Sequence, residues 1–129
     1  MLKEDDLNQL MRIYLEKQRY IILDYNLGTQ KGPDIKACNE HGELIIECKG
    51  SCSAGGRFSK HATYTRLTSA VFNVINGVET FHQNNTKFAL AFPSDGHYQE
   101  LLAGMESFFL RMGVKIYWVW DDGRVEEQT

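Results

Sequence analysis

The sequence has few cysteines and no long apolar run, and both absences exclude classes of protein. Among its 129 residues there are three cysteines, Cys38, Cys48 and Cys52, without the C-x-x-C spacing of a zinc or redox motif. This small, odd number does not fit a disulfide framework and is typical of a protein of the reducing cytoplasm. No apolar run approaches the roughly 18–20 residues that cross a bilayer. We therefore expect a cytoplasmic location and no membrane partner.

Acidic residues are absent from the middle of the chain. The net charge of −3 does not by itself favour a polyanionic partner. Between Glu47 and Glu79, however, there is no Asp or Glu, and this gap holds Lys49, Arg57, Lys60, Arg66 and His61. The gap indicates either a local basic face for nucleic acid or a solvated basic loop, and charge alone does not choose between them.

Apolar periodicity predicts alternating helices and strands. Helices are predicted over residues 4–19, from about 61 to 76 with Gly77 as the stop, and 95–112 with Gly113 as the stop. Strands are predicted at residues 21–25, 34–38, 44–49, 87–92 and 114–120, with residues 50–60 as a loop. We expect the first three strands to form an antiparallel meander, and the last two to run parallel to their neighbours. The expected fold is one α/β domain over residues 1–129, a mixed sheet flanked by helices in the order αβββαβαβ.

Three charged residues lie at the ends of two neighbouring strands. Side chains alternate along a strand, so Glu47 and Lys49 point to one face and Cys48 to the other. Asp34 opens the antiparallel partner strand, and the hairpin should bring it close to Glu47 and Lys49. Two carboxylates beside an ammonium group can hold Mg²⁺ and position water for attack on a phosphate ester. The alternative is a Pro33-Asp34 turn pair next to a solvated strand end.

Pro33-Asp34, a spacer and then Glu47-Cys48-Lys49 resemble the motif of the PD-(D/E)xK nuclease superfamily, which includes restriction endonucleases and Holliday-junction resolvases. The superfamily's core of helix, three meandering strands, helix and strand has the element order predicted above, so the resemblance implies a restriction-endonuclease-like fold. It also implies that Asp34, Glu47 and the backbone carbonyl of Cys48 bind metal, and that Lys49 assists the attacking water. The implied reaction is Mg²⁺-dependent hydrolysis of DNA, in which Mn²⁺ can substitute.

The sequence departs from the superfamily at the first helix, where many members carry a further acid. The comparable position is near Asn8, which is not an acid. Glu4, one helical turn earlier, could substitute for it, or could be only a favourable charge in the first helical turn. The departure puts metal affinity or rate in question, but not the fold.

Residues around the expected site are candidates for contact with DNA. The glycine-rich loop at residues 50–60 could become ordered on the phosphates, or could be an uninvolved connector. On the next helix, Ser69 and Asn73 share a polar face with a basic residue, and a solvated face is the preferred interpretation for these two. The predicted nucleic-acid contacts are Lys31, Arg57, Lys60, His61 and Arg66.

Aromatic residues of the last strand suggest a second protein surface. Tyr117, Trp118 and Trp120 alternate between faces. Core packing accounts for one face, and we expect a homodimer through this last strand and the third helix on the other. The leading functional hypothesis is a metal-dependent endonuclease, resolvase-like or related to restriction or repair. The alternatives are a catalytically weakened nucleic-acid- or protein-binding module of the same fold, and a non-enzymatic interaction protein.

Overall fold

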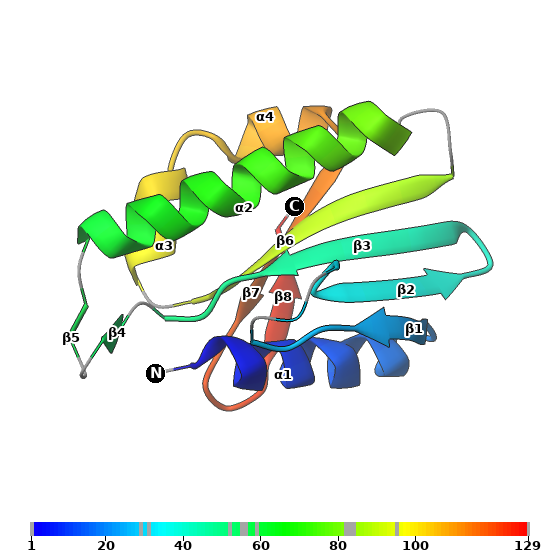
Figure 1. Cartoon of the computed structure of the whole chain (residues 1–129), viewed down its shortest axis with the longest axis horizontal. Coiled ribbons are helices and arrows are strands. Elements are labelled where there is room, and N and C mark those ends of the chain that lie inside the picture. Colours follow the sequence, from blue (N-terminus) through cyan, green and yellow to red (C-terminus); the bar gives the residue numbers. More distant parts are fainter. Residues whose placement is uncertain are drawn as a thin grey trace.

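A mixed six-stranded sheet forms the centre of the computed structural model (Figure 1). The structure describes residues 2–28, 30, 32–51, 53–54, 57–58, 60–81, 85–94 and 96–128. From edge to edge, the strands are β1 (Ile21–Tyr25), β2 (Ile35–Asn39), β3 (Gly42–Cys48), β6 (Thr86–Pro93), β7 (Val114–Val119) and β8 (Val125–Glu127). A separate hairpin of β4 (Ser53–Ala54) and β5 (Arg57–Phe58) follows β3.

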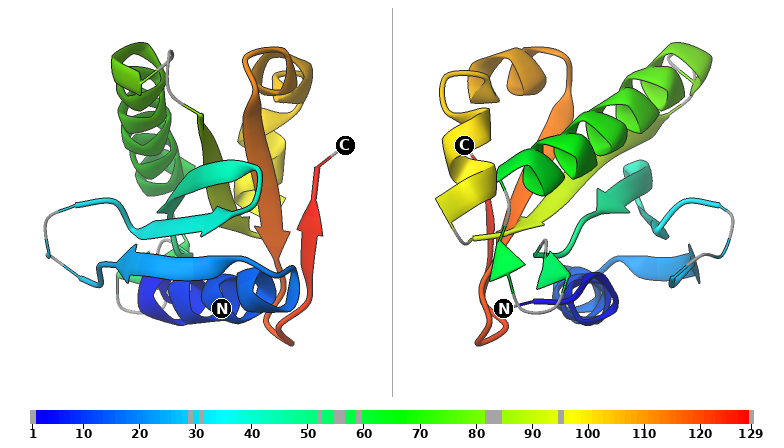
Figure 2. Two further views of the ribbon diagram at one scale, coloured as in Figure 1. Left: turned by 90° about the vertical axis from the view of Figure 1, so that its right-hand side faces the viewer. Right: turned by 60° about the vertical axis from the view of Figure 1, so that its left-hand side comes forward.

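Helices cover both faces of the sheet, as Figure 2 shows. One face packs against α1 (Glu4–Lys17), and the other packs against α2 (Lys60–Phe81), α3 (Gly96–Leu102) and α4 (Glu106–Arg111). The central strand β6 is buried on both sides. Ala89 and Ala91 join the core beneath α1, whereas Leu90 and Phe92 join the core beneath α2–α4. This two-sided burial explains why the strand is apolar almost throughout.

The strand directions are those predicted. β1, β2 and β3 form an antiparallel meander, and β3, β6 and β7 run parallel. The expected α/β class, a mixed sheet flanked by helices, is therefore confirmed. The structure has three features that were not predicted. They are the β4–β5 hairpin, a break in the third helix, and the edge strand β8, which pairs antiparallel to β7.

The second helix does not stop at Gly77, and that prediction was wrong. α2 continues to Phe81. A Cβ atom on Gly77 would lie 2.6 Å from Cε1 of Phe88 in β6. The glycine therefore marks a close approach of the helix to the sheet and not a helix end.

The third predicted helix is two short helices. Gly104, with φ +84°, lies between α3 and α4, in a backbone region that glycine adopts readily. Leu102 before the break and Phe109 after it are both buried against the same core. The apolar pattern runs on across the break because both helices pack on one face of the sheet. Asp95, the first residue of the predicted third helix, lies outside the described residues.

Across the described residues, no helix has both the length and the apolar character needed to span a membrane.

Candidate functional site

The β2–β3 hairpin brings the Asp34 and Glu47 carboxyl groups together. Ile35 pairs with Ile46 across the hairpin, which places the residues just beyond them side by side. The backbone N–H of Cys48 donates to Asp34 Oδ2 at 2.8 Å. Asp34 and Glu47 also hydrogen-bond to each other through their side chains. The expected proximity is confirmed, whereas the roles of these residues stay predictions.

Burial raises the pKa values of both carboxyl groups of this pair. Burial raises the pKa of Glu47 to about 7, and the Asp34 charge adds to this rise, while the Lys49 ammonium opposes it. Burial also raises the pKa of Asp34, against the effects of the Cys48 N–H and Lys49. Because the two groups are within hydrogen-bonding distance, protonated Glu47 can donate to ionised Asp34. Such a pair is typical of a site built to take up positive charge.

Glu4 lies at the same site, brought there by the first turn of α1. Burial raises the pKa of its carboxyl group, and the Lys49 charge lowers it, so both residues face a common space. Glu4 Oε1 is buried and has no hydrogen-bond partner among the described residues. The Arg66 guanidinium Nη1 is 3.9 Å from this oxygen, beyond hydrogen-bonding distance. Of the two interpretations of Glu4 above, the geometry favours a site residue over a simple helix-end charge.

Asn8, at the position expected to carry an acid, supports the backbone of Asp34. Its side chain is 2% exposed. Its Nδ2 donates to the carbonyl oxygens of Asp34 at 3.0 Å and Asn26 at 3.4 Å. Its Oδ1 accepts from Arg12 Nε at 2.8 Å, and the Arg12 guanidinium lies over the Tyr25 ring at 3.7 Å. An amide is needed here because it must both donate and accept.

Asn8→Ala is expected to destabilise the protein by about 2 kcal/mol, because it leaves buried carbonyl groups without their donor. Asn8→Asp should cost at least as much, since its ionised carboxylate would face the Asp34 and Asn26 carbonyl oxygens. Urea unfolding of both variants measures this. An Asn8→Asp protein as stable as the wild type, with tighter Mg²⁺ binding, would instead show that the position accepts a metal-ligating acid.

Helix α2 contributes two further residues to the site. The Asn73 side chain hydrogen-bonds to Glu47, and Arg66 pairs with Glu4. Asn73 and Ser69 are both exposed, as expected of a solvated face, but the Asn73 side chain in addition reaches Glu47. The signal in the sequence was the shared spacing of i, i+3 and i+7, which puts Asn73 on the same face as Arg66.

Tyr98 holds Gly50, the residue that follows Lys49, and no pattern in the sequence indicates this contact. The Tyr98 hydroxyl, buried and stacked on Phe92, donates to the Gly50 carbonyl oxygen at 2.9 Å. The next residue, Ser51, donates its backbone N–H to the Leu2 carbonyl oxygen at 2.7 Å. The chain that leaves β3 is thereby fixed between the start of α1 and α3.

The other predicted DNA contacts are only partly described. Lys31 lies outside the described residues. Arg57 belongs to β5, and Lys60 and His61 open α2, but the side chains of these three lie outside the described part of the chain. Arg66 is exposed beside Glu4, where it can meet a phosphate group.

The last strand does not offer the dimer surface expected of it. β7 lies inside the sheet between β6 and β8. Tyr117 is 2% exposed and Trp118 is 5% exposed, because both join the core. Trp120 lies beneath the Arg124 guanidinium at 4.0 Å from the ring centroid. A short edge strand thus covers the aromatic residues that suggested an interface.

The oxygen donors at this site fit Mg²⁺. Among the described residues, no group of three or more His, Cys, Asp or Glu side chains is arranged to hold a metal by itself. Mg²⁺ needs fewer protein ligands, since one or two carboxylates suffice when water completes its coordination shell. The Asp34–Glu47 pair and the Glu4 oxygen, which accepts no hydrogen bond from the described residues, are hard donors. The Cys48 thiol is fully buried in the core, and burial raises its pKa, so the site lacks a soft donor for zinc.

Solved structures show that this fold is shared. An XisH family protein from Nostoc punctiforme is 17% identical over 93% of this chain and 95% of its own, with a TM-score of 0.63. An fdxN element excision controlling factor from Anabaena variabilis is 15% identical over 95% of this chain and 96% of its own, with a TM-score of 0.65. At such identities the likeness concerns the fold alone. No family model matches the sequence, and no curated protein matches it.

Proposed function

We propose that this protein is a metal-dependent endonuclease of the PD-(D/E)xK superfamily that hydrolyses phosphodiester bonds of DNA. The observation that carries the proposal is the hydrogen-bonded Asp34–Glu47 carboxyl pair, whose pKa values are influenced by the adjacent Lys49. A buried carboxyl pair next to an ammonium group is costly to maintain, and one carboxylate would suffice to accept the bond from the Cys48 N–H. Metal-assisted phosphoryl chemistry gives the second carboxyl group a role.

The residues of the site have separate roles in the proposed reaction. Asp34, Glu47 and the Cys48 carbonyl would hold Mg²⁺ or Mn²⁺, which when bound supplies Lewis-acid polarisation of a phosphoryl oxygen. Lys49 positions the attacking water and offsets negative charge on the phosphate. Asn73 orients Glu47, and Glu4 adds a carboxylate that can hold a water molecule.

Two further observations support a DNA substrate. Arg66 is exposed on the flank of α2 that faces the site, within the acid-free part of the sequence. One protein of the same fold is named an element excision controlling factor, and that name fits a role in DNA processing.

The test is cleavage of supercoiled, linear and four-way-junction DNA with Mg²⁺ or Mn²⁺, with RNA alongside. Lys49→Ala is expected to lower the cleavage rate at least about 100-fold and leave DNA affinity nearly unchanged. Lys36→Ala is the matched control, because Lys36 lies on the neighbouring strand and pairs at the surface with Glu43 at 3.8 Å. Cleavage by Lys49→Ala at the wild-type rate would exclude Lys49 from the chemistry.

A binding module of the same fold is the second candidate. It is favoured by Asn8, which serves the backbone where many superfamily members carry an acid. If the wild-type protein binds these nucleic acids and cuts none of them with either metal, the binding module replaces the nuclease. If it neither binds nor cuts, both proposals fail.

A further inference from the structure

A large apolar surface lies on the outer helices, on a different flank of α2 from the residues of the proposed site. We call it the helix patch, and its members are Tyr64, Phe72, Ile75, Met105, Phe108 and Met112. Phe72 is the most exposed of the six, at 70%. With about 200 Å² for a full side chain of this size, the patch exposes roughly 600 Å² of apolar surface. A typical monomer rarely shows that much in one place.

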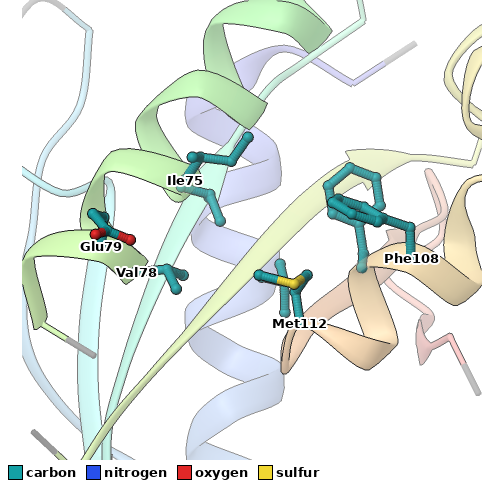
Figure 3. Close-up of a pocket in the computed structure, with 8 residues that line it drawn as sticks. Ile75, Val78, Glu79, Phe108 and Met112 are labelled. Carbon is teal, nitrogen blue, oxygen red and sulfur yellow. The ribbon is translucent and has the colours of Figure 1, made fainter. Parts of the chain in front are cut away.

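The patch surrounds a groove between α2 and the α3–α4 layer. Two hollows of about 130 and 480 Å³ lie along it, and Ile75 and Phe109 line both. Figure 3 shows Ile75 and Val78 of α2 opposite Phe108 and Met112. Glu79 is the one charged residue among the described residues that line the two hollows. A groove so poor in cations does not suit nucleic acid, which is bound through phosphate contacts.

We propose that a second copy of this chain covers the helix patch in a two-fold symmetric dimer. A two-fold interface uses the same surface on both partners, so that surface must contain both a groove and a ridge that fills it. Both are present here, because Tyr64, Phe72 and Ile75 form an exposed apolar ridge on the α2 wall of the groove. Each α2 can therefore place its ridge in the groove of the other copy.

The area of the patch fits such a dimer. A standard interface buries about 800 Å² on each partner, of which somewhat more than half is apolar. The roughly 600 Å² exposed here supplies that apolar share. This places the dimer on α2, α3 and α4. The sequence predicted a homodimer through the third helix and the last strand. The dimer proposed here uses the region of the third helix but not the last strand.

The dimer would leave the proposed site open. With 3.6 residues per turn, Arg66 and Asn73 lie on a different flank of α2 from Phe72 and Ile75. The first two contact the site residues Glu4 and Glu47. The inference is independent of the proposed function, because its test measures mass and uses neither DNA nor metal.

Sedimentation equilibrium over a concentration series up to about 100 µM tests the dimer. The wild type should sediment at twice the 14.8 kDa of the chain. Phe72→Glu and Met112→Glu, one on each wall of the groove, should each weaken the dimer at least about 30-fold. Ile13→Glu is the matched control, since Ile13 is 44% exposed on α1 outside the patch, and its mass should stay that of the dimer.

Circular dichroism identifies any variant that fails to fold. The test then rests on the variant from the other wall of the groove. A wild-type protein that remains monomeric at the highest concentration would overturn the proposal and leave the patch to a different partner. Dimers that survive both substitutions in the patch, or that dissociate equally with Ile13→Glu, would overturn it as well.

Discussion

Glu47→Gln is expected to stabilise the metal-free protein at about pH 8 by about 2 kcal/mol. The full rise of the Glu47 pKa from 4.5 to about 7 would correspond to a larger gain in the free energy of unfolding. The carboxyl group is partly open to solvent, however, and this reduces the expected gain. The same substitution should lower the proposed cleavage at least about 100-fold, because it removes an ionisable oxygen ligand. Gain of stability with loss of activity is the pattern expected of a functional residue.

The sign of this stability change follows from the direction of the Glu47 pKa shift. A carboxyl group whose pKa is higher in the folded state binds its proton more tightly when folded. Its contribution to stability is therefore complete below its ordinary pKa of 4.5 and disappears as the pH rises through about 7. Glutamine resembles the protonated carboxyl group, since its amide can still donate to Asp34 and its oxygen can accept from Asn73. The gain should thus be nearly absent at about pH 4 and complete at about pH 8.

Urea unfolding of the metal-free protein at the two pH values measures this difference. Glu43→Gln is the matched control, because Glu43 lies on the same strand and pairs with the surface residue Lys36. It should show no pH-dependent gain. Equal stability of Glu47→Gln and the wild type at both pH values would mean that the Glu47 proton is not held by the fold.

Gly50→Ala is expected to destabilise the protein by about 3 kcal/mol, at the upper end for an overpacked site. A Cβ atom on Gly50 would collide with the backbone nitrogen of Glu4 and lie 2.8 Å from its Cα. Backbone atoms at the start of a helix cannot rotate away as a side chain can. The first turn of α1 must therefore move, and with it Glu4, so cleavage should fall together with stability.

Gly104→Ala provides the comparison for this second substitution. Gly104 has φ +84°, and nothing lies within 4 Å of the position of its Cβ, so alanine meets backbone strain there without a collision. That strain alone is expected to lower the free energy of unfolding by about 1 kcal/mol. Thermal or urea unfolding of the two variants separates the effects. If Gly50→Ala costs no more than Gly104→Ala, α1 is free to shift, and Gly50 does not fix the position of Glu4.

The periodicity of the sequence was a good guide to elements and a poor guide to their ends. It predicted the strand that became β6, in which Leu90 and Ala91 face opposite cores. It failed at Gly77 and at Gly104. A glycine that ends a helix and one that lets a helix approach a phenyl ring look alike in sequence, because the ring of Phe88 comes from a distant strand.

The sequence by itself determined the meeting of Asp34 with Glu47 and Lys49. These residues belong to one hairpin, and Asp34 accepts its bond from Cys48 only 14 positions away, so strand alternation and one turn are enough to bring them together. Only the tertiary structure decided that Glu4 and Asn73 join them, that Asn8 serves the Asp34 backbone 26 positions away, and that Tyr98 holds Gly50 across 48 positions. Those contacts depend on how each helix is placed on the sheet, and that placement is set by the packing of the whole core, which no local pattern records.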